Sequence, residues 1–110
     1  MPGPDGGAGP PEDLFAALAD PTRRRLLDRL STDGPLSATD LARDCPVSRQ
    51  AVAKHLGTLS AAGLVQPQRR GREVVYGVTP KRLAEASRWL EGIGAKWDSR
   101  LSALAEQFDS

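Results

Sequence analysis

The sequence has very few of the side chains that carry most covalent and metal chemistry. It contains one cysteine, one histidine and only two Trp, one Tyr and two Phe among 110 residues. A single cysteine cannot form a disulfide within the chain. An enzyme would need a nucleophile with a base, paired carboxylates in a pocket or a glycine-rich phosphate loop, and the sequence offers none of these. We therefore expect neither a disulfide framework nor catalysis.

Long apolar runs are missing as well. No stretch approaches the roughly 20 apolar residues that cross a bilayer, and no charged-then-apolar leader follows Met1. Residues 1–10, MPGPDGGAGP, are rich in Gly and Pro without apolar periodicity, which predicts a disordered tail. Residues 11–110 have the size of one small domain, so we predict a single-domain cytoplasmic protein that does not enter a membrane. Its core would be small, which favours association with a partner subunit.

The net charge of +1 hides a local concentration of basic residues. Residues 47–82 contain seven basic residues and one acidic residue, whereas the segments on both sides are net acidic. This asymmetry indicates one anion-binding face rather than a uniformly basic protein.

The first structured residues predict two short helices with a sharp break between them. Apolar residues at helical spacing mark residues 11–19, and Asp20 then stands as a cap before Pro21 at the first position of the next helix. The basic triplet Arg23–Arg25 points in three directions on a helix. We interpret this triplet as serving solubility and the packing of side-chain stems.

The next signals predict a helix-turn-helix followed by a hairpin. Ser37 and Ser48 each cap a helix, Pro46 stops the first, and Gly63 ends the second. Residues 64–78, LVQPQRRGREVVYGV, then read as two extended runs around a glycine turn, with a proline that limits the first run to a sheet edge. A two-stranded hairpin directly after a helix-turn-helix is a wing.

A long helix ends the predicted fold. Thr79 and Pro80 cap and begin it, and it runs nearly to Ser110. Its apolar residues recur every three or four positions: Leu83, Ala86, Leu90, Ile93, Trp97, Leu101, Leu104 and Phe108. This series is long for so small a core, so we expect it to pack against a second copy of the chain. The fold class is therefore mainly α with a two-stranded β-hairpin, a winged helix-turn-helix with a long C-terminal dimerisation helix.

The helix that Ser48 caps has one apolar side and one side with few bulky residues. On the second side Gln50 and Lys54 lie one turn apart among small residues. Such a side fits the DNA major groove, which is about 12 Å wide, and there Gln can pair with adenine while Lys reaches guanine or a phosphate. The cap also leaves helix N-terminal amides pointing toward phosphate. Three arginines at the wing tip can reach phosphates or the minor groove: Arg69, Arg70 and Arg72.

Three runs of the sequence resemble a known family. DPTRRRLLDRL, LSATDLARDCPVSRQAVAKHLGTLSAAGLV and RRGREVVYGVT are similar to the ArsR-type winged helix-turn-helix repressors of bacteria, and the terminal helix is similar to a metal-independent branch. The resemblance implies a homodimer, packed through its first and last helices, that blocks transcription from an inverted-repeat operator of double-stranded DNA. It places the recognition-helix contacts at Ser48, Arg49, Gln50, Ala51, Lys54 and His55, and the wing contacts at Arg70 and Arg72. The first helix contributes Leu14, Phe15 and Leu18 to the predicted dimer contact.

The same resemblance bears on metals. Many members bind soft metals through Cys-x-Cys in the helix before the recognition helix, whereas this sequence has Ser37 and Thr39 at those places. Neutral hydroxyls do not replace thiolates for a soft cation, so we expect no metal site and no cofactor. Cys45 reads as a small apolar filler, with a redox role as the alternative.

Other functions stay open at this stage. A winged helix can serve protein association alone, and a regulator can activate instead of repress. A small-molecule effector between the terminal helices is a further alternative, which Trp89 and Trp97 would line.

Overall fold

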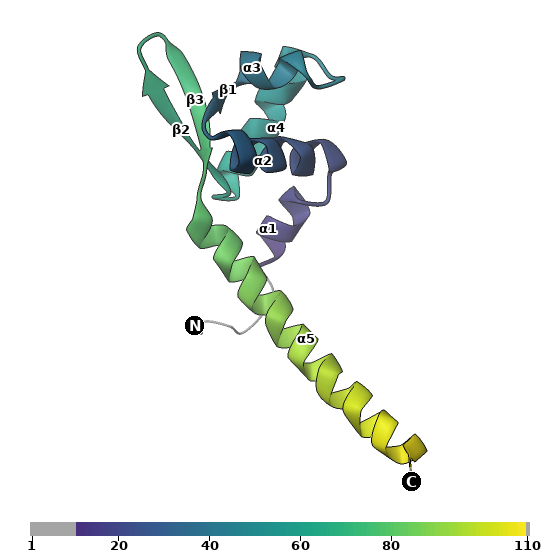
Figure 1. The fold of residues 1–110 in the computed structure, drawn as a ribbon. Coiled ribbons are helices and arrows are strands. Elements are labelled where there is room, and N and C mark those ends of the chain that lie inside the picture. The colour runs from purple at the N-terminus through teal and green to yellow at the C-terminus, as the bar shows by residue number, and fades with distance from the viewer. Residues whose placement is uncertain (1–10, 110) are drawn as a thin grey trace.

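The computed structural model describes residues 11–109, with side chains as far as residue 106. The predicted tail at residues 1–10 lies outside this range. Five helices and three strands follow in the order α1 (Glu12–Ala17), α2 (Pro21–Asp33), β1 (Leu36–Ser37), α3 (Ala38–Arg43), α4 (Arg49–Ala61), β2 (Val65–Arg70), β3 (Glu73–Val78) and α5 (Pro80–Asp109) (Figure 1). The predicted winged helix-turn-helix with a long terminal helix is confirmed.

The helix starts follow from local hydrogen bonds. The side chain of Asp20 accepts from the backbone N–H of Thr22 at 2.8 Å, and that of Ser48 accepts from the N–H of Ala51 at 3.1 Å. Ser37 and Asp40 form a reciprocal capping box at the start of α3. Each cap satisfies amides that have no partner within the helix, which explains why sequence signals located these helices correctly.

The sheet has one strand more than the predicted hairpin. All pairs are antiparallel in the order β1-β3-β2, and β1 joins through the pairs Leu36 with Tyr76 and Ser37 with Val75. A two-residue strand is too short to show an alternating pattern, and Ser37 also caps a helix, so the sequence did not reveal it. The turn at Gly71, with φ of 63°, and the edge position of β2 agree with prediction.

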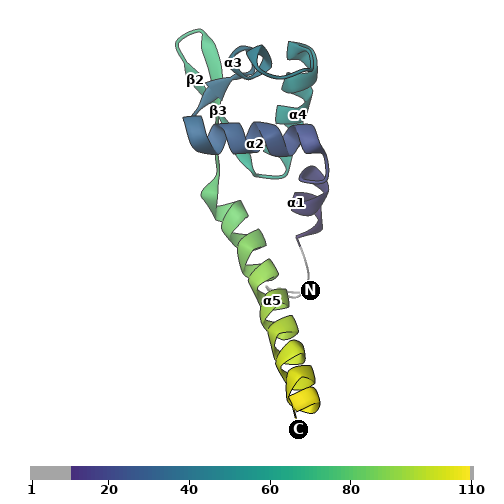
Figure 2. The same cartoon turned by 45° about the vertical axis from the view of Figure 1, so that its right-hand side comes forward.

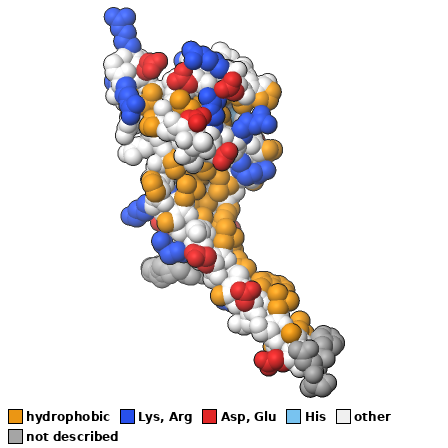
Figure 3. All heavy atoms as spheres, in the orientation of Figure 1, with side chains coloured by type: hydrophobic (Ala, Val, Ile, Leu, Met, Phe, Trp, Pro, Cys, Tyr) orange, Lys and Arg blue, Asp and Glu red, His pale blue; other side chains and the backbone are white. Residues whose placement is uncertain are grey.

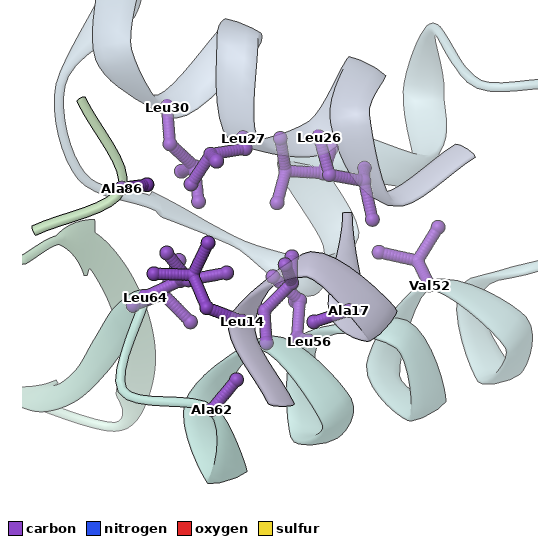
Figure 4. Close-up of a cluster of buried hydrophobic side chains, with 13 residues drawn as sticks. Leu14, Ala17, Leu26, Leu27, Leu30, Val52, Leu56, Ala62, Leu64 and Ala86 are labelled. Carbon is purple, nitrogen blue, oxygen red and sulfur yellow. The ribbon is translucent and has the colours of Figure 1, made fainter. Parts of the chain in front are cut away.

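One hydrophobic core consists mainly of leucines from α1, α2, α3, α4 and the segment just before β2 (Figure 4). Its fully buried large side chains are Leu14, Leu26, Leu41, Val52, Leu56, Leu59 and Leu64. The prediction that Leu14 lies in a dimer contact is wrong, because Leu14 is 0% exposed within its own chain and has no surface left for a partner. A six-residue helix such as α1 is not stable alone, and this burial holds it on the core.

Helix α5 touches the core only near its start and then projects away (Figures 1 and 2). Ala86 is 6% exposed within the core, and the ring of Trp89 packs on Phe15 of α1 with 5.3 Å between the centroids. The radius of gyration is 18.4 Å, whereas a compact domain of 100 residues has about 13 Å. Most of α5 therefore lies outside the core of its own chain.

Two arginines of the triplet in α2 have specific partners. Nε of Arg23 donates to the carbonyl oxygen of Ala17 at 2.6 Å, and Nη1 of Arg24 donates to that of Leu18 at 2.7 Å. They satisfy carbonyl groups at the end of α1 that have no helical partner. Arg24 and Arg25 are exposed and Arg23 is half-buried, so the triplet also has a structural role that the sequence did not suggest.

Three carboxylates are held in their charged form by the fold. The hydrogen bond from Arg82 lowers the pKa of Asp13 below its ordinary value of 3.8, and backbone N–H groups lower the pKa values of Asp20 and Asp40. A group whose pKa is lower in the folded state stabilises that state above its unfolded pKa, and the contribution is lost as pH falls through the folded pKa.

We therefore expect the thermal unfolding midpoint to drop as pH falls from about 5 toward 2. Calorimetry on the native chain and on Asp40→Asn would test this, because the variant should lose part of the pH dependence. Asp28→Asn, at an exposed position of α2, is the control and should keep the native profile. An Asp40→Asn profile identical to the native one would contradict the expectation.

Candidate nucleic-acid interface

Helix α4 separates its residues into a buried side and an open side. Val52, Leu56 and Leu59 are fully buried, as predicted. The open side, called here the exposed face of α4, consists of Ser48, Arg49, Gln50, Ala53 and Lys54. Ala51, another predicted contact, is half-buried. The exposed face carries two cations and one amide around a small alanine, so its backbone can approach another surface closely.

Arg49 is oriented by a residue of the preceding helix. Its Nε donates to Oγ1 of Thr39 at 2.9 Å, which joins the N-terminal ends of α3 and α4. Sequence reasoning considered Thr39 only as a place without a metal-binding thiol and missed this role. No sequence pattern could have revealed it, because the two residues meet only when the helices pack.

His55 lies at the boundary between the exposed face and the core. It is half-buried, and its Nδ1 lies 3.3 Å from Nη1 of Arg23 in α2. A guanidinium only donates, so Nδ1 is the acceptor in this hydrogen bond. The imidazole therefore links α4 to α2, and its contact with DNA stays a prediction.

The wing, residues 65–78, presents its arginines at the tip of the hairpin. The side chains of Arg69, Arg70 and Arg72 are exposed, and Figure 3 shows Lys and Arg side chains gathered over this tip. Arg70 pairs in register with Glu73, the one acidic residue of the basic segment. The wing tip is therefore strongly positive.

The exposed face of α4 and the wing border one open hollow. It is lined by Ser37, Ala38, Thr39, Arg49, Ala53, Arg72, Glu73, Val74 and Tyr76. Arg49 from the helix and Arg72 from the wing thus lie on the same concave surface. The two basic features that the sequence suggested separately therefore border the same hollow.

A second surface of the protein is apolar. Along α5, Leu90 is 54% exposed, Trp97 53%, Leu101 56% and Leu104 48%, and Ile93 between them is half-buried. We call these five residues the exposed stripe, and they extend the line that begins at the buried Ala86. Figure 3 shows hydrophobic side chains continuing down this helix.

The other predicted dimer residues have different surroundings. Phe15, Leu18 and Leu83 are partly buried against the core. The side chain of Phe108 lies outside the described residues. The ring of Trp89 packs against Phe15 of the same chain, and the guanidinium of Arg100 lies 5.2 Å from the centroid of the Trp97 ring.

The hydroxyls at the places of the metal-binding cysteines have structural partners. Oγ of Ser37 accepts from the N–H of Asp40 at 3.1 Å, and Thr39 accepts from Arg49. Within residues 11–109, no three His, Cys, Asp or Glu side chains gather as a metal site would require. Cys45 is half-buried. No helix in that range combines the length and apolar character of a membrane span.

Comparison with known proteins connects this geometry with a family. Residues 18–68 match the family described as a helix-turn-helix domain. The HTH-type transcriptional regulator Rv2034 of Mycobacterium tuberculosis is 41% identical over 100 residues, which cover 91% of this chain and 90% of that protein. The transcriptional repressor SdpR of Bacillus subtilis is 30% identical over 89 residues, which cover 81% of this chain and 98% of SdpR.

Solved structures agree. An ArsR-like transcriptional regulator from Rhodococcus sp. RHA1 is 46% identical, with a TM-score of 0.73, and the match covers 87% of this chain and 90% of that one. The ArsR family transcriptional regulator RHA00566, known from a crystal structure, is 31% identical, with a TM-score of 0.71. The match covers 80% of this chain and 90% of that one. The chain therefore belongs to the ArsR-like family of DNA-binding helix-turn-helix transcriptional regulators.

Proposed function

We propose that this regulator is a homodimeric, metal-independent repressor that binds an inverted-repeat operator. The observation that carries the proposal is the concave surface between the exposed face of α4 and the wing, with Arg49 and Arg72 on its lining. It acts by binding, without catalysis, and works in the cytoplasm, where bacterial DNA lies. Repression is supported by the similarity to SdpR, which is named a transcriptional repressor.

The exposed face of α4 suits the major groove. The major groove admits an α-helix, and the small Ala53 lets the backbone of α4 approach the DNA closely. Gln50 and Lys54 stand one turn apart near the N-terminus, where recognition helices contact base edges. In this arrangement Gln50 reads a base, and Arg70 and Arg72 hold the backbone or enter the minor groove.

The exposed stripe supports the homodimer. Its residues continue a line that is buried at Ala86, so one helix face passes from the core into solvent without changing its chemistry. Large side chains that are half exposed along one helix are costly in water, and a second α5 would cover them. A two-fold dimer also predicts an inverted-repeat operator, because each subunit then reads one half-site.

Metal independence is supported by the partners of Ser37 and Thr39, whose hydroxyls are used to cap α3 and to orient Arg49. We expect operator affinity to be indifferent to micromolar zinc, cadmium or arsenite and to chelator. Fluorescence anisotropy with labelled operator would measure it. A reproducible tenfold change in Kd, about 1.4 kcal/mol, on adding any of them would contradict this expectation.

The proposed function is tested by selecting DNA from a random pool with the purified native chain. We expect an inverted repeat, bound by two subunits, with an affinity for random DNA that is weaker by about a thousandfold or more. Recovery of no consensus sequence would overturn the proposal and favour the protein-association module. Placing the selected operator over a reporter promoter then distinguishes repression from activation.

A further inference from the structure

Arg82, near the start of α5, contacts three helices with one side chain. Its Nε donates to the carbonyl oxygen of Ala62, the residue that ends α4, at 3.0 Å. Its Nη2 donates to Asp13 of α1 at 2.5 Å, and its Nη1 to Glu85 of α5 at 2.7 Å. The charge of Arg82 therefore belongs to the junction of the helices and is not part of the basic surface that faces DNA.

Arg23 makes the matching connection at the other end of α1. Its Nε donates to the carbonyl oxygen of Ala17, the last residue of α1, and its Nη1 lies 3.3 Å from Nδ1 of His55 in the middle of α4. The side chain of Arg23 is 18% exposed and that of Arg82 24%, so both arginines are largely shielded from water. Each arginine thus joins α1 to α4.

Helix α1 is one of the elements that α5 packs against. Phe15 of α1 packs on Trp89 of α5, and Leu14 and Ala86 are buried in the same core cluster. A helix of six residues has no rigidity of its own, so its placement depends on what holds its two ends. Arg82 holds the first end and Arg23 the last.

We propose that Arg23 and Arg82 are positioning residues that set the orientation of α4 relative to α5, and with it the half-site spacing that the dimer accepts. The inference rests on the proposed function, because only a dimer has two recognition helices whose separation matters. Changing the spacing by one base pair moves a half-site by about 3.4 Å and rotates it by about a tenth of a turn. A dimer discriminates against such a change only if its recognition helices are held rigidly.

The test uses the full chain, the operator selected by the native protein, and two operators with one base pair added or removed between half-sites. We expect the native dimer to prefer its own spacing by about tenfold or more, and Arg82→Met and Arg23→Met to reduce this preference to about threefold or less. Methionine keeps an apolar stem of similar length and removes the hydrogen bonds. The dimer mass and the affinity for a single half-site should stay at native values.

Two further variants separate positioning from stability. Lys81→Met, at an exposed neighbouring position, removes the same charge and should keep the native preference. Arg82→Lys keeps the charge but not the planar guanidinium that reaches three acceptors, so its spacing preference should be intermediate.

A folded, dimeric Arg82→Met protein with the native spacing preference would overturn the proposal. If that variant does not fold, Arg23→Met and Asp13→Ala decide in the same assay, since both leave the bond from Arg82 to Ala62 in place and should also reduce the spacing preference. A native chain that is monomeric or selects no inverted repeat would refute the proposed function itself, which is a different outcome from a native dimer whose variants keep their spacing preference.

Discussion

Replacing both Leu90 and Leu101 with glutamate is expected to give a monomer whose operator affinity falls about a hundredfold or more. The two side chains are 54% and 56% exposed in one chain, yet they lie on the line that continues from the buried Ala86. Buried against a second α5, each glutamate would be a charge without a partner. Losing the dimer also loses the gain in affinity that comes from binding two half-sites with one molecule.

Size-exclusion chromatography with light scattering would give the mass, and anisotropy the affinity. Ser99→Glu with Ser102→Glu is a matched control, because it adds the same charge to exposed positions of α5 outside the exposed stripe. The control should remain dimeric and bind normally. A stable monomer of the leucine variant with undiminished operator binding would refute the dimer.

Gln50→Ala is expected to cost about 1 to 3 kcal/mol on the selected operator while barely changing the affinity for random DNA. Gln50 is exposed near the N-terminus of α4, where an amide can pair with a base edge. Base contacts distinguish sequences, so removing one lowers specificity and leaves non-specific affinity in place. A salt titration with both DNAs measures the two affinities, because one ionic strength alone cannot separate them.

The same salt titration applied to Arg70→Ala and Arg72→Ala tests the wing for phosphate contacts. If these wing residues contact phosphates, each variant should weaken both DNAs by similar factors and reduce the salt slope by about one per lost contact. If Gln50→Ala lowers the affinities for operator and random DNA equally, Gln50 contacts the DNA backbone and does not read a base. An unchanged salt slope in both arginine variants would mean that Arg70 and Arg72 do not contact DNA phosphates.

Much of the interface could be predicted because its signals are local. Ser48 caps α4 through an amide three residues away, and the helical period then places Gln50 and Lys54 opposite the core without any knowledge of the rest of the fold. The wing follows in the same way from a glycine turn between two extended runs. The hollow that unites Arg49 with Arg72 was beyond such reasoning, because it exists only once α3, α4 and the sheet have packed together.

Local sequence signals were enough to predict the helices, the wing, the two sides of α4 and the apolar line of α5, since each depends on residues within about one helical turn or one strand pair. The tertiary structure decided the rest. Leu14 is a core residue because α1 packs inward, β1 exists because Ser37 meets Val75, and Arg23 and Arg82 join α1 to α4. The ion pair between Arg82 and Asp13 spans 69 positions of the sequence, and the hydrogen bond between Arg23 and His55 spans 32. Contacts over such distances depend on how whole elements pack, which no local pattern encodes.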